Sequence, residues 1–423
     1  MMDVKLLINS LWPGWRRLLN VSSSAALAVA NLVLSLLLLS NGLTSEFGSF
    51  AMLQVSAGLA YGITNALLGA PLLIFLNQPV IPPLALRGFF LANLLLALLL
   101  TLGQVALVYA LDLPAEIFWH AGTLVLLGVI RWFGRSYCLS VRPLASMRSD
   151  WVTAFFMLLG ALWLWFSDNI SLTQVLMVCW VSLLAGIIAL GWEHMRQLLL
   201  SMQDRELQTV NLGIRNQGKA ALVGALSLEA TANGHSYIIS LLAGPAAFAP
   251  IAAATLLYRP VLVVQGALAM YERPRLASLL NASPATLSGL AARQLARWSL
   301  LSWAGNTLLV ALLLYFPEHG LWSADEQHTM LTLCLLWGCI MFLRSIRQAP
   351  ATVAQASDNF ALLAKACATA ALVTLPVAAL LVWQVSAVAS LFALLAGELV
   401  ILLYLYPFYL TRIKPQQSTE PQL

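Results

Sequence analysis

The sequence predicts an all-α polytopic membrane protein in which twelve transmembrane helices form two six-helix bundles. Two observations predict this fold class. Of the 423 residues, 61% are hydrophobic and only 9% are charged, whereas a soluble globular domain usually has about 25% charged residues. Apolar runs of about 20 residues, the length that crosses a bilayer as a helix, also recur along the chain.

The expected spans are separated by short loops, except at one longer polar segment that divides the chain into two halves. They cover residues 22–41, 47–76, 85–111, 115–134, 151–167, 172–192, 219–242, 247–272, 295–316, 327–345, 360–383 and 386–410. The predicted parts are an interfacial helix on the cytoplasmic surface (1–20), an N-terminal lobe (21–192), a cytoplasmic linker helix (193–218), a C-terminal lobe (219–411) and a cytoplasmic tail (412–423).

The positions of the basic residues predict that both termini are cytoplasmic. None of the loops expected outside contains Lys or Arg, and all of the 22 basic residues except Arg259 fall in inside segments or in adjoining helix turns. Lys and Arg accumulate in the cytoplasmic loops of membrane proteins. The same pattern accounts for the formal charge of +5, so we expect no nucleic-acid partner.

The two halves also resemble each other in hydropathy and turn spacing. A shift of 198 positions places residues 22–76 over 220–274, with Phe50 on Phe248. Because each half has an even number of spans, the repeat would be parallel, with its axis along the membrane normal. Such an architecture predicts a central cavity between two lobes.

Two consecutive spans in the second half carry the residues that we expect to bind substrate. Glu229, Asn233, Ser236 and Ser240 fall at i, i+4, i+7 and i+11, on one stripe of a helix. Arg259 lies near the middle of the next span, where a charge costs roughly 2.5–3.5 kcal/mol even on a lenient scale. We therefore expect Glu229 and Arg259 to form an ion pair. The sequence leaves open whether this pair binds substrate or only fixes packing.

Two further residues are candidates for a transport site. His235 lies in the same span as Glu229, where it would contact substrate, relay protons or simply bond a neighbouring helix. Glu398 lies midway along the last span and could carry a coupling proton, because a carboxylate removed from water takes up a proton more readily.

Motifs for other chemistries are absent or incomplete. The segment GIRNQGKA (213–220) resembles a phosphate-binding loop, but Ala220 replaces the Ser or Thr that would hold magnesium. The five cysteines form no CxxC pair, and the histidines show no metal-ligand spacing. We expect neither a cofactor nor a metal site, and no enzymatic activity.

At EFGSFAMLQVSAGLAYGITNALLGAPLLIFL (46–76) and LAGPAAFAPIAAATLLYRPVLVVQGAL (242–268) the chain resembles polysaccharide exporters. It is similar to the oligosaccharidyl-lipid flippase branch of the multidrug/oligosaccharidyl-lipid/polysaccharide (MOP) superfamily. This resemblance implies a V-shaped pair of six-helix bundles, alternating access and a bacterial inner membrane. It also implies an undecaprenyl-pyrophosphate-linked oligosaccharide as substrate. Arg259 matches by position the cavity cations that engage the pyrophosphate in such flippases.

The leading hypothesis is an ion-coupled flippase that moves a lipid-linked oligosaccharide from the cytoplasmic to the outer leaflet, in contact with membrane lipids and polysaccharide assembly proteins. Arg259 would bind the phosphate, Asn233, Ser236, Ser240 and His235 the sugar, and Glu229 and Glu398 the coupling ion. One alternative is a multidrug or organic-cation antiporter of the same fold. Another is a membrane polysaccharide polymerase or glycosyltransferase, against which the short outer loop PEHGLWSADE, without Arg, argues. A non-transporting assembly scaffold is the fourth.

Overall fold

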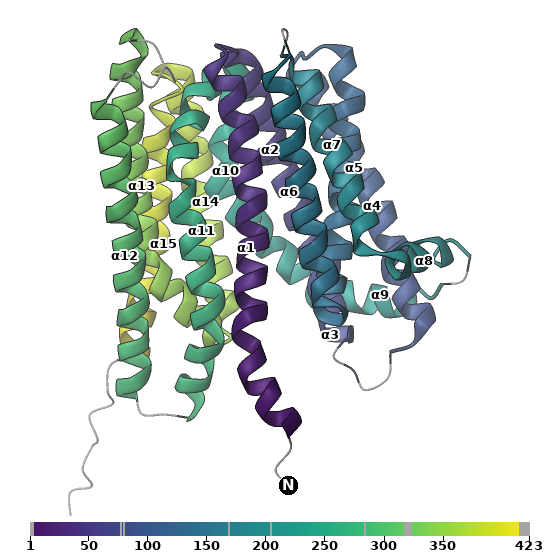
Figure 1. The fold of residues 1–423 in the computed structure, drawn as a ribbon. Helices are drawn as coiled ribbons and strands as arrows, with labels where there is room; N and C mark the ends of the chain where they lie inside the picture. The colour runs from purple at the N-terminus through teal and green to yellow at the C-terminus, as the bar shows by residue number, and fades with distance from the viewer. Residues whose placement is uncertain are drawn as a thin grey trace, which may run out of the picture. The chain divides into compact units, whose positions relative to one another are not determined.

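The computed structural model describes residues 4–76, 78, 81–167, 170–203, 205–282, 285–316 and 324–413, and within them all regular secondary structure is helical (Figure 1). Two of the segments, named η, are single π-helical turns. In chain order the elements are α1 (Val4–Ser40), α2 (Thr44–Thr64), η1 (Asn65–Gly69), α3 (Ala70–Leu76), α4 (Pro83–Ala110), α5 (Ala115–Val141), α6 (Pro143–Trp165), α7 (Leu172–Leu190), α8 (Trp192–Leu200), α9 (Gln208–Gly213), η2 (Ile214–Gly218), α10 (Lys219–Leu242), α11 (Pro245–Ala282), α12 (Ala285–Tyr315), α13 (Ala324–Ala356), α14 (Phe360–Gln384) and α15 (Ser390–Ile413).

The prediction of a many-span helical chain is confirmed for ten spans. Among the described residues, ten helical stretches are long and apolar enough to cross a membrane. The two remaining predicted spans correspond to α6 and α10, which have sufficient length but are not among these ten. Charged and polar side chains reduce their hydropathy, namely Arg148 and Asp150 in α6 and Glu229, Asn233 and His235 in α10. The total of twelve spans therefore stays a prediction.

Several helices extend beyond their predicted ends. Helix α1 runs without a break from Val4 to Ser40, so the short N-terminal helix expected over 1–20 is continuous with the first span. Helix α13 continues to Ala356, eleven residues past the predicted end of its span. The acidic outer loop expected over 317–326 and the tail from residue 414 lie largely or wholly outside the described residues.

The span from Thr44 to Leu76 contains the π-helical turn η1 just before Pro71. A proline has no N–H, so Pro71 cannot donate to the carbonyl of Leu67 four residues earlier. The second π turn, η2, packs against this point. A Cβ atom added to Gly218 would lie only 3.1 Å from the Leu67 carbonyl oxygen. The two π turns therefore contact each other closely, and glycine at 218 permits the approach.

The chain forms two compact units, Met1–Leu226 (unit 1) and Ser227–Leu423 (unit 2), which meet in sequence within α10. The segment predicted as an inter-lobe linker, 193–218, packs on unit 1, because α8 and α9 contact α4. The backbone N–H of Glu206 donates to the Leu84 carbonyl at 3.0 Å. Buried Phe89, Phe90, Phe133 and Tyr137 form a core cluster beneath this segment.

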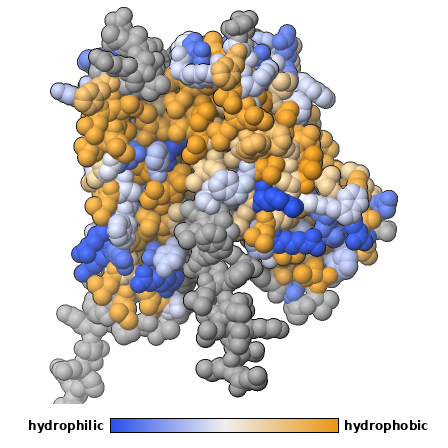
Figure 2. All heavy atoms as spheres, in the orientation of Figure 1, coloured by the Kyte–Doolittle hydropathy of each residue, from blue (hydrophilic) through white to orange (hydrophobic). Residues whose placement is uncertain are grey.

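In unit 2, α11, α12 and α13 pack on one another, and α15 packs on both α13 and α14. The outer faces of the helices in both units are apolar, and hydrophobic residues cover much of the surface in Figure 2. Examples are Leu102, which is 67% exposed, and Leu372, which is 77% exposed. Leucine exposed over whole helix faces is unfavourable in water and favourable in lipid, as expected of membrane-spanning helices.

Candidate functional site

The polar stripe predicted on one helix is present on α10. The Nδ2 group of Asn233 donates to Oε1 of Glu229 at 2.8 Å, and both side chains are half-buried. One and two turns further along, Ser236 and Ser240 are each 2% exposed. Within the part of the chain that the structure describes, the buried Ser240 hydroxyl has no hydrogen-bond partner. The stripe therefore presents one carboxylate, one amide and two hydroxyls along the same face.

The expected Glu229–Arg259 ion pair is wrong for this structure. Among the described residues, no ion pair of 4.0 Å or less includes either side chain. Helical spacing places Asn233 directly beside Glu229, so the carboxylate is satisfied by its own helix. On α11 the neighbouring Tyr258 is the buried residue, at 1% exposure, and Arg259 lies about 100° further round the helix, half-buried.

Glu398 pairs instead with two arginines of α13. The Nε group of Arg344 lies 2.6 Å from Glu398 Oε1, and that of Arg347 lies 3.1 Å from Oε2. Glu398 itself is 1% exposed. Because Arg344 and Arg347 are three residues apart on one helix face, both reach the same carboxylate. Two guanidinium groups against one carboxylate leave this buried group with a net charge of +1.

The polar contacts continue from Arg344 to α10. The Arg344 Cζ atom lies 5.9 Å from the centre of the Trp337 ring, and the ring of His235 lies 6.1 Å from the same indole. His235 Nε2 lies 3.5 Å from the Ser236 hydroxyl. We call Glu398, Arg344, Arg347, Trp337 and His235 the Glu398 cluster. It joins α15, α13 and α10 within unit 2.

Three buried polar atoms of the Glu398 cluster have no hydrogen-bond partner within the described part of the chain, namely His235 Nδ1, Trp337 Nε1 and Arg344 Nη2. Buried polar groups are costly unless they are bonded to protein, water or a ligand. Three donors or acceptors on neighbouring side chains therefore provide an interior that can hold water or an anionic group. The surplus positive charge favours an anion over a cation.

Glu398, His235 and Ser236 are among the site residues that the sequence predicts, whereas Arg344, Arg347 and Trp337 are not. Arg344 and Arg347 were assigned to a cytoplasmic segment because the span was expected to end at residue 345, whereas α13 continues to Ala356. The i, i+3 spacing of the two arginines was the available signal. It could have been matched to the lone carboxylate Glu398 on the last helix.

Unit 1 contains a second buried charge cluster. The Nη2 group of Arg131 lies 2.6 Å from Asp150 Oδ1, and Arg135 Nε lies 2.8 Å from Oδ2. Asp150 is fully buried and Arg131 is 5% exposed. The hydroxyls of Ser23 and Ser149 bond Asp150 and Arg131 respectively. We call Asp150, Arg131 and Arg135 the Asp150 cluster.

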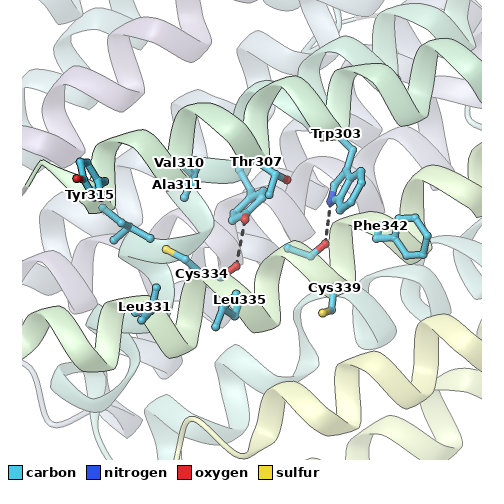
Figure 3. A pocket seen from close by; sticks show the side chains of 13 residues that line it. Trp303, Thr307, Val310, Ala311, Tyr315, Leu331, Cys334, Leu335, Cys339 and Phe342 are labelled. Atoms are coloured by element: carbon cyan, nitrogen blue, oxygen red, sulfur yellow. Dashed lines mark hydrogen bonds between the residues drawn. The ribbon is translucent and has the colours of Figure 1, made fainter.

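A cavity in unit 2 has a different character. It has a volume of about 590 Å³ and lies between α12 and α13, with Tyr258 of α11 at its wall (Figure 3). The Tyr258 hydroxyl donates to the Cys334 carbonyl at 3.1 Å, and Trp303 Nε1 donates to that of Gly338 at 2.9 Å. These bonds occupy the polar groups of Tyr258 and Trp303, and most of the other lining side chains are apolar, so the cavity wall is suited to hydrocarbon. It contains none of the predicted site residues.

Metal-binding groups are not assembled in the described part of the chain. There, no three His, Cys, Asp or Glu side chains lie close enough together to hold a metal ion. The cysteines are free, and only Cys339 is exposed.

Comparison with known proteins gives a match at the level of fold. No protein-family model matches the chain, and no curated protein matches its sequence. The lipid II flippase MurJ, in an inward closed conformation, aligns over 94% of this chain and 90% of its own, with a TM-score of 0.70 and 10% identity. An inward-facing multidrug resistance MATE family transporter of the MOP superfamily aligns over 92% and 94%, with a TM-score of 0.65 and 12% identity.

A third solved structure is a MOP superfamily transporter from Pyrococcus furiosus, described by the reverse polarity of its binding pocket. It aligns over 94% of both chains, with a TM-score of 0.57 and 14% identity. All three likenesses extend over nearly the whole chain at low identity. The chain therefore has the fold shared by MATE transporters of the MOP superfamily and the lipid II flippase MurJ.

Proposed function

We propose that the chain is an ion-coupled membrane transporter that flips a lipid-linked oligosaccharide from the cytoplasmic to the outer leaflet by alternating access. The shared fold supports a transporter, since MATE proteins and MurJ are described as a multidrug transporter and a lipid flippase. The ten apolar helices support a multi-pass membrane location, for which we propose the bacterial inner membrane. Polysaccharide assembly proteins are the proposed partners.

The observation that carries the choice of substrate is the sign of the buried charge in unit 2. The Glu398 cluster has two guanidinium groups and one carboxylate, and Arg259 has no ion-pair partner among the described residues. Arginine binds phosphate with two parallel hydrogen bonds and remains charged at all physiological pH values. The Pyrococcus furiosus transporter is described as having a binding pocket of reverse polarity, and that polarity is said to suggest a different function for that protein. By the same reasoning, surplus arginine supports a phosphate-bearing substrate here.

We assign the roles as follows. Arg259 binds the phosphate, and the polar stripe with His235 binds sugar hydroxyls. Glu229 and Glu398 respond to the coupling ion. Glu398 is held by Arg344 and Arg347, so its protonation would release two guanidinium groups for an anionic substrate. Uptake of the ion and of the substrate would thereby be linked at one group.

The test is transport by substituted proteins that still insert in the membrane. Arg259→Ala should weaken substrate binding about ten- to hundredfold. This factor corresponds to the loss of one charged hydrogen bond, which contributes roughly 1.5–3 kcal/mol. Glu229→Gln should reduce the dependence of transport on the ion gradient. The matched control is Arg273→Ala, which removes an exposed arginine from the same helix. Surface-polysaccharide display in cells and flipping of a lipid-linked glycan in vesicles are the readouts. Full activity of both variants would remove the site assignment.

A second candidate is a multidrug or organic-cation antiporter. One observation favours it: Glu229 has no cationic partner among the described residues and accepts only from Asn233. A half-buried carboxylate of this kind could neutralise a cationic drug. A deletion strain that becomes sensitive to cationic drugs while its surface polysaccharide is unchanged would support this function over the flippase.

A further inference from the structure

A second cavity lies in unit 1, where α5 turns into α6 and α7 turns into α8. It has a volume of about 520 Å³ and is lined by Arg142, Leu144, Ala145, Arg148, Leu190, Gly191, Trp192 and Glu193. None of these residues belongs to the proposed transport site. We propose that this cavity, which we call the corner site, binds the headgroup of an anionic phospholipid.

Two one-residue turns build the corner site. Arg142 is the single residue between α5 and α6, and Gly191 is the single residue between α7 and α8. Gly191 has φ +99°, a region that side-chain-bearing residues rarely adopt. A Cβ atom there would also lie 3.2 Å from Arg148 Nη2. These tight turns bring the starts of α6 and α8 to the same cavity, and neither N-cap residue, Arg142 nor Gly191, caps its helix with a side chain.

The charge of the corner site suits an anion. Arg148 Nε donates to the Ala189 carbonyl at 2.7 Å, which fixes its guanidinium group beside Gly191. Arg142 is exposed and takes part in no ion pair among the described residues. Glu193 supplies the one negative charge in the lining and lies 3.7 Å from Arg196, outside the cavity. Two arginines against one shared carboxylate leave donors for a phosphate group.

The surroundings favour a lipid over free phosphate. Val141, Leu144 and Trp192 surround the charged groups with side chains that are 47%, 62% and 73% exposed. Exposed aliphatic groups beside a tryptophan and arginines are typical of the boundary between headgroups and acyl chains. Basic pockets between helices at the cytoplasmic side bind anionic headgroups. The positive-inside pattern assigns this end of the helices to that side.

The experiment measures lipid preference of the full-length protein in detergent. Phosphatidylglycerol and phosphatidylcholine with identical acyl chains are compared by native mass spectrometry and by thermal stabilisation. The wild type should prefer phosphatidylglycerol several-fold, and added salt should reduce the preference. Arg142→Gln should reduce the ratio of phosphatidylglycerol to phosphatidylcholine binding to about one, because the exposed arginine supplies the positive charge that is not used in an ion pair. Arg148→Gln, checked for folding by its unfolding curve, should also reduce it.

The control is Arg412→Gln, which removes an exposed arginine from the end of α15 and should retain the wild-type preference. An unchanged preference in Arg142→Gln would overturn the proposal, as would an equal loss in the control. A third measurement adds inorganic phosphate as a competitor of the lipid. Competition by phosphate alone at concentrations equal to those of the lipid would identify a free-anion site instead. All of these readouts are independent of transport, so they can fail while the proposed function stands.

Discussion

Arg344 and Glu398 join α13 to α15 through a distance of 2.6 Å between Nε and Oε1, inside unit 2 and away from solvent. Arg347 approaches the other oxygen of the same carboxylate. In unit 1, Arg131 and Arg135 on α5 hold Asp150 in the same way. Each unit thus contains one buried carboxylate between two arginines of a single helix, and each pair of arginines lies on the fourth long helix of its predicted half.

We expect Glu398→Gln to destabilise the protein by about 3–5 kcal/mol, because it leaves two buried arginines without a counter-charge. Thermal unfolding in detergent would measure the loss. Arg344→Met combined with Glu398→Leu should be less destabilised than the single variant. Arg196→Gln, which breaks the exposed pair with Glu193, should change stability by no more than about 0.5 kcal/mol. Equal effects of Glu398→Gln and Arg196→Gln would contradict a stabilising role for the buried cluster.

Asp150→Asn should have an effect of similar size in unit 1. Its carboxylate receives both arginines and the Ser23 hydroxyl, so the substitution breaks contacts of α1, α5 and α6 together. The comparison is Ser24→Ala, which removes only an exposed contact with Arg135 and should change stability by less than about 0.5 kcal/mol. If protease cleavage of folded protein in detergent is no faster for Asp150→Asn than for Ser24→Ala, the Asp150 cluster does not hold these helices together.

Gly218→Ala should destabilise unit 1 by roughly 1–3 kcal/mol, because the added methyl group would press on the Leu67 carbonyl at 3.1 Å. Gly224→Ala lies six residues further along and meets nothing within 4 Å. There the higher helix propensity of alanine should stabilise the protein by up to about 1 kcal/mol. Unfolding curves of the two variants should therefore shift in opposite directions. Stabilisation of both variants would show that the two π turns do not need to touch.

His194 should make stability depend on pH. It lies on α8, outside the apolar spans, at 2% exposure against Phe90, and burial lowers the pKa of its imidazole from 6.5 to about 4. Below pH 6.5 the unfolded chain takes up a proton that the folded chain excludes, so the unfolding free energy should fall as pH decreases toward 4. The full difference in the His194 pKa between the folded and unfolded chain corresponds to a loss of about 3 kcal/mol in the unfolding free energy.

The measurement is unfolding in detergent between pH 7.5 and pH 4. His194→Leu should reduce the acid-induced loss of stability, because leucine cannot take up the proton. A loss of stability that is unchanged in His194→Leu would assign the effect to other groups.

The sequence could predict the helices but not all of their ends. A long apolar stretch without charged residues defines a membrane span well. For this reason ten spans are present among the described residues close to their predicted positions. Helix ends such as that of α13 are set by packing. The eleven residues past the predicted end include the polar Arg347 and Gln348, but they pack on α11 and α15. Hydropathy alone therefore ended this helix too early.

Composition and periodicity by themselves determined that this protein is a helical membrane chain, with a polar stripe on α10 and unusual charges at Glu229, Arg259 and Glu398. These follow from local spacing, which the 3.6-residue helical repeat fixes whatever the neighbours do. Only the tertiary structure decided which charges meet. Rotation of each helix about its axis, set by packing of its whole apolar surface, gave Glu398 two arginines and left Arg259 without an ion-pair partner among the described residues.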